Sequence, residues 1–239
     1  MKHTRFIAAA LSVMLLIQTS AFSQDDKDKR DKIIGSGKVI TKEVPVKSFN
    51  DIKVSGVFHV ILSQGSKEEV KIEADDNLQS LFEVSNDGDQ LVIKMKDNQN
   101  FDSDHKLKVY ISFNKLKKLS IRTVGSVSST ESLNFDDISI ESKGVGPVDL
   151  KMTAQKANIE NTGVGTMKLQ GKADIAIIKN TGVGSIQAGD FVVQTMDITN
   201  TGVGHSEVNA EKEIKVKDSF LGKVKNKGAA AVKKMNKAA

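Results

Sequence analysis

The residues that most invite a chemical interpretation are three copies of the pentapeptide NTGVG, which begin at Asn161, Asn180 and Asn200. Glycine-rich loops bind phosphate when their backbone amides, at the N-terminus of a following helix, point at the ligand. In this chain each copy is followed by alternating apolar and polar residues, which indicate a β-strand. We therefore interpret the glycines as corners of a β-structure and predict no phosphate site there.

A further glycine-rich stretch, Gly35-Ser36-Gly37-Lys38, has two features of a nucleotide-binding loop. Such a loop follows the pattern G-x-x-x-x-G-K-[ST]. Lys32 stands where the first glycine is required, and Val39 stands where a hydroxyl residue should follow the lysine. The stretch is interpreted as a turn that leads into the first strand.

Metal ligands are sparse. The histidines His3, His59, His105 and His205 show no metal-ligand spacing, and no cysteine is present to supply a thiolate. The segment FDSDH at residues 101–105 offers oxygen ligands but lacks the glycine and terminal glutamate of a calcium loop. A weak calcium site and a solvated loop are both open there, and we predict the solvated loop, with no metal and no cofactor.

Catalytic motifs of the G-x-S-x-G and H-E-x-x-H types do not occur. Lyases and glycosidases with β-helical folds need clustered carboxylates or a basic residue on one outer face. Glu141 and Glu160 would stack in such a column, with Lys179 and Thr199 following. We interpret the column as a solvated face and predict a protein that is not an enzyme. The alternative is a β-helix lyase or glycosidase that acts on an envelope or extracellular polysaccharide.

The elements that must position these residues repeat along the chain. The second glycine of each corner, at Gly146, Gly165, Gly184 and Gly204, recurs after 19, 19 and 20 residues. Stacked units of this kind pair as parallel strands about 4.8 Å apart. We predict an all-β fold, a parallel β-helix or β-solenoid with rungs of about 19 residues. Its structural rung motif comprises Gly144, Gly146, Asn161, Gly163, Gly165, Asn180, Gly182, Gly184, Asn200, Gly202 and Gly204.

The stacking also predicts what the residues of each corner do. Glycine permits a tight corner with an unusual φ at little steric cost. Asn161, Asn180 and Asn200 are expected to form a ladder in which each amide side chain bonds the next. The valine between the two glycines is expected to fill the corner from inside.

The chain before the repeat also carries strand patterns. Runs such as EEVKIEA and DQLVIKMK alternate apolar and polar residues, and Asn86–Asp89 between two runs is a strong hairpin signal. We predict a hairpin-rich antiparallel β segment ahead of the solenoid. The expected organisation is a signal peptide (1–23), a charged linker (24–34), a single β-solenoid domain (35–222) and a basic C-terminal tail (223–239).

The N-terminus has the features of a secretory signal. Lys2 and Arg5 precede the apolar run FIAAALSVMLLI, and Ala21 and Ser23 fit a cleavage site before Gln24. The run is shorter than the ~20 residues that a membrane-spanning helix needs. We expect an exported protein, periplasmic, outer-membrane-associated or secreted, with no transmembrane segment in the mature chain.

The formal net charge of +5 arises at the two ends of the chain, in the signal and in six lysines after Ser219. The body between them is mildly acidic, and one tyrosine and no tryptophan are available for stacking on bases. The composition therefore excludes a nucleic-acid partner.

Several segments together resemble a known family. They are GSGKV at residues 35–39, FNDIKVSGVFHVILSQG at 49–65, the hairpin at 86–89, VYISFNKLKKLSI at 109–121 and the G-x-G-x-apolar rungs. The chain is similar, from Gly35 to about Gly222, to the putative auto-transporter adhesin, head-GIN domain family. The resemblance implies an exported bacterial protein of stacked β-strands with no established activity, and it supplies no functional residues. We expect an adhesin-like binding or structural protein with an unknown envelope, glycan or protein ligand.

Overall fold

The computed structural model describes residues 32–235. The expected signal peptide, its cleavage site before Gln24, His3 and most of the charged linker lie outside the described residues. Within residues 32–235 the chain consists of β-strands and one short 3-10 helix, η1 (Gln79–Leu81). No helix among these residues has the length and apolar character needed to cross a membrane.

The strands fall into two groups along the chain. Those ahead of the repeat are β1 (Ile33–Ile34), β2 (Val39–Val44), β3 (Asp51–Val57), β4 (His59–Gln64), β5 (Glu69–Asp75), β6 (Phe82–Asp87), β7 (Gln90–Met95), β8 (Phe101–Asp102) and β9 (Lys108–Phe113). Those of the repeat are β10 (Lys118–Val124), β11 (Val127–Ser129), β12 (Leu133–Ser142), β13 (Val148–Asn161), β14 (Met167–Asn180), β15 (Ile186–Asn200), β16 (Ser206–Asp218), β17 (Val224–Asn226) and β18 (Val232–Lys234).

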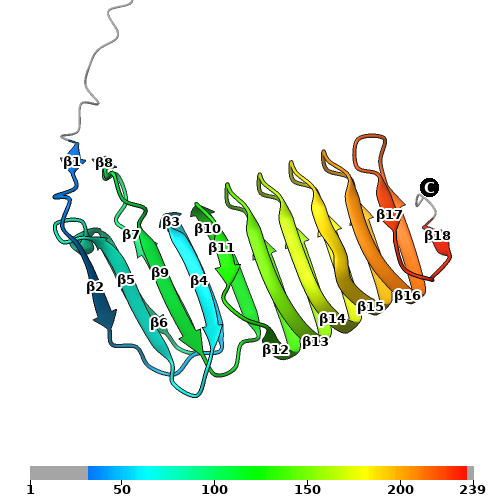
Figure 1. Ribbon diagram of the computed structural model, residues 1–239, viewed down its shortest axis with the longest axis horizontal. Coiled ribbons are helices and arrows are strands. Elements are labelled where there is room, and N and C mark those ends of the chain that lie inside the picture. The colour runs from blue at the N-terminus through cyan, green and yellow to red at the C-terminus, as the bar shows by residue number, and fades with distance from the viewer. Residues whose placement is uncertain (1–31, 236–239) are drawn as a thin grey trace, which may run out of the picture. The chain divides into compact units, whose positions relative to one another are not determined.

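Each full turn of the repeat is one long strand that bends in its middle, followed by a glycine corner (Figure 1). The first half of β13 pairs in parallel with that of β14, where Val148 lies beside Met167. Their second halves pair through Ile159 and Ile178. The halves of successive turns thus form two facing sheets, and the predicted all-β solenoid with rungs of about 19 residues is confirmed.

Alternation along each strand produces the core between these sheets. In β13 the side chains of Val148, Leu150 and Met152 are buried, while Asp149 and Lys151 between them are exposed. Each buried side chain of this kind contributes about 1.5–3 kcal/mol. Equivalent positions stack from turn to turn in continuous apolar columns, of which one contains Ile140, Ile159, Ile178, Ile198 and Val216.

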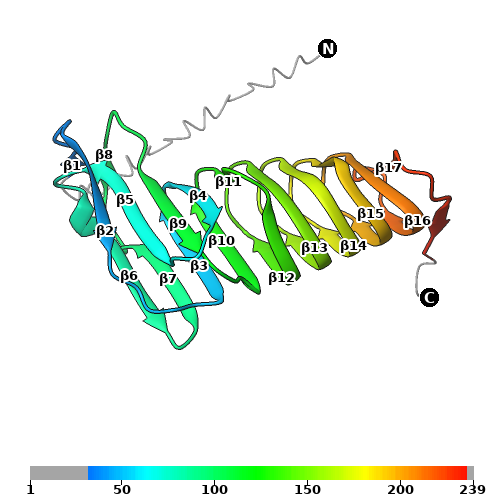
Figure 2. The same ribbon diagram turned by 60° about the horizontal axis from the view of Figure 1, so that its bottom comes forward.

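The N-terminal part contains the predicted antiparallel strands. β2 pairs antiparallel with β5, β5 with β9, and β6 with β7. The turn between β6 and β7 lies at the predicted hairpin, where Gly88 has a φ of +57°. β3 and β4 pair in parallel with β10 and β11, so the stacking of the solenoid already begins in this part (Figure 2).

The solenoid also extends beyond residue 222, where the sequence placed the start of a basic tail. β17 and β18 both pair in parallel with β16 and complete a last, partial turn. Ala230, on the segment between them, is buried against the core. Residues 224–234 therefore cover the apolar end of the last full rung.

Candidate functional site

The glycine corners are tight because successive turns touch backbone to backbone. A Cβ atom on Gly163 would lie 2.4 Å from the carbonyl oxygen of Gly144, and one on Gly165 would lie 2.3 Å from that of Gly146. Gly165 also has a φ of +138°, which L-residues rarely adopt. Both glycines of this corner are therefore required by its geometry, and amides of the corner are already used in hydrogen bonds between neighbouring turns.

The asparagines of the corners form a buried ladder. Asn161 donates from Nδ2 to Oδ1 of Asn180 over 2.8 Å, and Asn180 donates in the same way to Asn200 over 2.9 Å. The last amide donates to the carbonyl oxygen of Gly204. These bonds offset the cost of burying three polar side chains, which is about 1–3 kcal/mol for each unpaired group.

The expectation that the valine fills each corner from inside is wrong. Val145, Val164, Val183 and Val203 point outward, with 47–50% of each residue exposed. The inside of the corner is occupied by the backbone of the glycines and by the asparagine ladder. No space remains there for a branched side chain.

The two glutamates of the outward column that was considered as a catalytic site are each paired with a lysine. Glu141 lies 2.5 Å from Lys143 Nζ, and Glu160 Oε1 lies 2.9 Å from Lys179 Nζ. The hydrogen bond from Lys143 holds the pKa of Glu141 below its ordinary value. A glycosidase general acid needs the opposite shift.

The stretch Gly35–Lys38 binds carboxylates of its own chain. The Gly37 amide donates to Oδ1 of Asp75 over 2.7 Å, and Ser36 Oγ donates to Oδ1 of Asp76 over 2.6 Å. The hydrogen bond from Ser103 lowers the pKa of Asp75 and keeps this carboxylate negative. A phosphate group would be repelled by both aspartates.

The structure brings His59 and His105 to the lining of one small cavity, of about 220 Å³, and places His205 elsewhere. His59 Nδ1 lies 2.6 Å from Ser126 Oγ, and burial lowers the pKa of His59. His105 lies in the loop after β8, whose last residue, Asp102, pairs with Lys32, and His205 follows the corner between β15 and β16. Within residues 32–235 no three His, Cys, Asp or Glu residues are placed to hold a metal ion.

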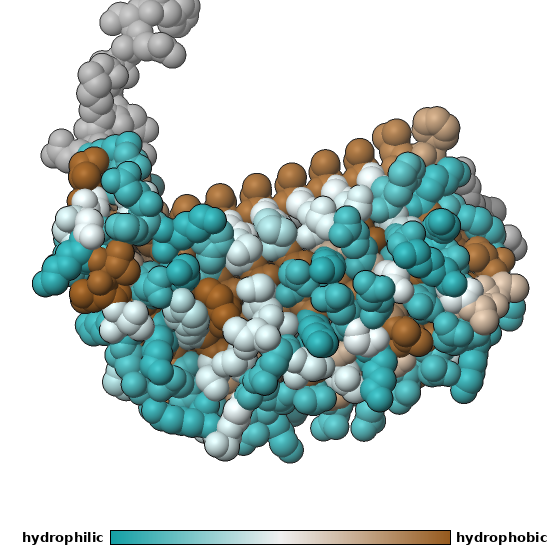
Figure 3. Space-filling model, viewed as in Figure 1, coloured by the Kyte–Doolittle hydropathy of each residue, from teal (hydrophilic) through white to brown (hydrophobic). Residues whose placement is uncertain are grey.

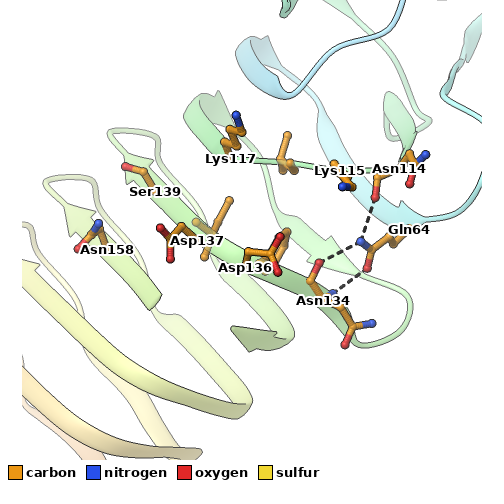
Figure 4. A pocket seen from close by; sticks show the side chains of 12 residues that line it. Gln64, Asn114, Lys115, Lys117, Asn134, Asp136, Asp137, Ser139 and Asn158 are labelled. Atoms are coloured by element: carbon orange, nitrogen blue, oxygen red, sulfur yellow. Dashed lines mark hydrogen bonds between the residues drawn. The ribbon is translucent and has the colours of Figure 1, made fainter. Parts of the chain in front are cut away.

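The structure contains a groove that sequence reasoning missed. It has a volume of about 710 Å³ and lies where the loop after β9 faces the first half of β12 (Figure 4). Gln64 holds its two walls together. Its Nε2 donates to the carbonyl oxygens of Asn114 and Asn134, and its Oε1 accepts from the Asn134 amide over 2.7 Å.

The polar side chains of this groove are free to bind. In the part of the chain that the structure describes, no hydrogen bond or ion pair engages the side chains of Asn114, Lys115, Lys117, Asn134, Asp136, Asp137 and Asn158. Leu116, Phe135 and Ile138 supply apolar surface beside them. We name this surface the polar groove.

A second cavity extends the polar groove along the bend of the solenoid. It has a volume of about 660 Å³, shares Phe135 with the first, and includes Gln155, Lys172 and Gln194 from later turns. The one sequence signal was Phe135-Asp136-Asp137, which interrupts the apolar alternation of β12 between Leu133 and Ile138. The combined site is open, elongated and lined by groups of both charges.

Parallel turns closed by glycine corners, after an antiparallel N-terminal part, place this chain among the β-solenoid proteins. The chain belongs to the family described as putative auto-transporter adhesin, head GIN domain, whose sequence profile matches residues 48–230. The resemblance seen in the sequence is thereby confirmed. No curated protein matches the chain at a significant level.

Solved structures show the same fold. A putative adhesin from Bacteroides fragilis is 32% identical, with a TM-score of 0.73 over 85% of this chain and 100% of that one. A putative adhesin from Parabacteroides merdae is 21% identical, with a TM-score of 0.54 over 86% of this chain and 100% of that one. A putative lipid binding protein from Parabacteroides distasonis is 18% identical, with a TM-score of 0.58 over the same shares.

Proposed function

We propose that this protein is an exported, non-catalytic β-solenoid of the cell envelope or extracellular space that binds an extended glycan in an adhesin-like way. The polar groove carries the proposal, because its amide and carboxylate side chains are exposed without partners. The basic residues Lys2 and Arg5 and the short apolar run that follows them near the N-terminus support export. The adhesin description of the family agrees with a binding role.

The groove has the chemistry that sugar hydroxyls require. Amide and carboxylate groups such as Asn134 and Asp136 accept or donate hydrogen bonds, while the face of Phe135 can pack on the apolar side of a sugar ring. Two adjoining cavities along one edge suit a chain of sugars better than a single compact ligand. Because the site is open to solvent, we expect modest affinity for each sugar unit.

A polysaccharide lyase or glycosidase is the rival function. The lysines beside Glu141 and Glu160 argue against catalysis in their column, so the remaining carboxylate pair is Asp136 and Asp137 in the polar groove. An enzyme built on these two would cleave the glycan that the groove binds.

A glycan-array screen of the mature protein, with polysaccharide turnover measured in parallel, tests both functions. Binding should weaken about fivefold in Asn134→Ala, because a lost hydrogen bond costs about 1 kcal/mol. Gln170→Ala is the matched control, since this amide of β14 lines neither cavity of the groove. Turnover that is abolished by Asp136→Asn or Asp137→Asn would establish the enzyme instead, and absence of any glycan binding would refute the proposal.

A further inference from the structure

The two adjoining cavities contain a column of polar side chains, one from each of four successive turns. The strand register aligns its members, because the residues directly before and after each one form parallel pairs from β12 through β15. We name it the bend column, and it consists of Asp136, Gln155, Asp174 and Gln194. Figure 3 shows the lower part of the molecule, where these strands bend, as mainly hydrophilic, with a brown row of corner side chains along the opposite edge.

The side chains of the bend column are available to a ligand. All four are exposed or half-buried, and none of them takes part in a hydrogen bond or an ion pair among residues 32–235. Elsewhere on the outer surface, carboxylates pair with lysines of the next turn, as Glu160 does with Lys179 and Asp149 with Lys168. The bend column therefore offers an unused carboxylate or amide oxygen, which accepts hydrogen bonds, on every turn.

A second column runs beside the first, two residues earlier in each strand. It consists of Asn134, Thr153, Lys172 and Val192. Between the two columns lie Phe135, Ala154 and Ala173, and the cavity of about 660 Å³ extends over this strip. Because the two alanines are small, the strip is hollow between the longer side chains on either side. The two columns thus form the sides of a trough that crosses the strands and follows the solenoid axis.

The trough has an end on each side. Before β12, the loop after β9 lines the first cavity, and Gln64 joins this loop to Asn134. After β15, the register is interrupted, because two residues of β16, Glu211 and Lys212, stand where one should lie beside Gln194. The regular column therefore has four members.

We propose that the trough binds an extended β-linked glycan that lies along the solenoid axis, across the strands, with one sugar unit at each member of the bend column. This inference rests on the proposed glycan binding and adds the direction and the linkage of the bound chain. Members of the column repeat at the strand spacing of about 4.8 Å. Sugar rings of an extended β-1,4-linked chain follow one another at nearly the same spacing, so each ring meets an equivalent acceptor for its hydroxyl groups.

The same spacing argues against other extended polymers. A peptide strand rises about 3.3 Å per residue, so its side chains on one face recur about every 6.6 Å. Such a chain is out of step with the bend column after a single turn. An α-1,4-linked glycan coils, and its rings leave the straight line of the trough after the first units.

Calorimetric titration of the mature protein with oligosaccharides of increasing length tests the proposal. The probes are β-1,4-linked oligomers of glucose, N-acetylglucosamine, mannose and xylose, from two to six units long. In at least one series, we expect the affinity to rise about fivefold with each added unit, the factor for one hydrogen bond, and to level off at four units. The α-1,4-linked oligomers of glucose are the matched control, and lengthening them should not strengthen binding.

Variants of the bend column test the position of each unit. Gln194→Ala should weaken binding of the four-unit oligomer about fivefold and leave the three-unit oligomer nearly unaffected, because three contiguous positions remain. Gln155→Ala should weaken binding of both oligomers, because it leaves at most two contiguous positions. Gln187→Ala is the matched control, since Gln187 is an exposed amide of β15 outside both cavities. All three side chains lie outside the core, so these variants should melt like the wild type.

The outcomes separate this inference from the proposed function. Glycan binding that stops strengthening at one or two units, that prefers the α-linked series, or that loses three-unit and four-unit oligomers equally in Gln194→Ala would overturn the axial arrangement and leave glycan binding in place. Absence of binding to every glycan would overturn both.

Discussion

Replacing Gly165 by alanine tests whether the corners depend on backbone contact between turns. The added Cβ would lie 2.3 Å from the carbonyl oxygen of Gly146, so one of the two turns must move. The movement disturbs two hydrogen bonds, from the Gly146 amide to the Val164 carbonyl and from the Gly165 amide to the Val183 carbonyl, both 2.8 Å long. The φ of +138° adds strain of its own.

The cost follows from these three terms. Each buried backbone group left without a partner costs about 1–3 kcal/mol, and a residue held in a sparsely populated φ region costs about 1–3 kcal/mol. We expect Gly165→Ala to lose about 4 kcal/mol of a total stability of about 5–15 kcal/mol. For a chain of this size that corresponds to a fall in Tm of about 10 °C.

Two matched variants separate the close approach from the backbone angle. Gly88 has a φ of +57° with nothing within 4 Å of its Cβ position, so Gly88→Ala carries only the conformational cost of about 1–2 kcal/mol. Gly163 lacks a positive φ but has the close approach, at 2.4 Å from Gly144 O. Thermal melts followed by circular dichroism should rank Gly88→Ala as mildest and Gly165→Ala as most severe. An equal fall in Tm for Gly88→Ala and Gly165→Ala would refute the conclusion that the corner depends on backbone contact between turns.

Three further outcomes are expected. The pKa of Asp75 is lowered in the folded state, so the stabilisation that this carboxylate gives is present above pH 3.8, its ordinary pKa, and is lost as the pH falls through the folded pKa. Asp75→Asn should therefore lower the urea midpoint of unfolding at pH 7 and have little effect on it in strong acid. Mass spectrometry of the exported protein should find an N-terminus at or near Gln24, and an intact Met1 in cytosolic extract would contradict export. Deleting Gly163–Thr181 removes one whole turn and should leave a folded protein that melts somewhat lower, whereas deleting half that length should unfold it.

The stacking of the turns could be predicted because every repeat carries the same inward residues and corner glycines at the same spacing. Inward positions such as Ile159 and Ile178 recur at the spacing of the corner glycines, and that spacing already specifies the parallel register. The error at Val164 was avoidable. Ile159, Asn161 and Gly163 occupy alternate inward positions, so alternation carried through the corner places Val164 outside.

The polar groove could not be predicted in the same way, because its two walls come from different parts of the chain. The loop at Asn114–Lys117 reaches β12 through Gln64, which bonds both walls from a third element, β4. None of these contacts follows from a repeat. Phe135-Asp136-Asp137 signalled only that β12 changes direction there.

The corner geometry explains the glycines but leaves the valine between them unexplained. Gly163 and Gly165 are required by contacts with the preceding turn, while the side chain of Val164 points outward and is half exposed. Threonine has the same branched shape and the same preference for strands, and it occupies the outward position two residues earlier at Thr162. The backbone would therefore accept threonine at every corner without exposing an additional methyl group. An aliphatic residue at all four corners, at Val145, Val164, Val183 and Val203, therefore needs a reason outside the rung.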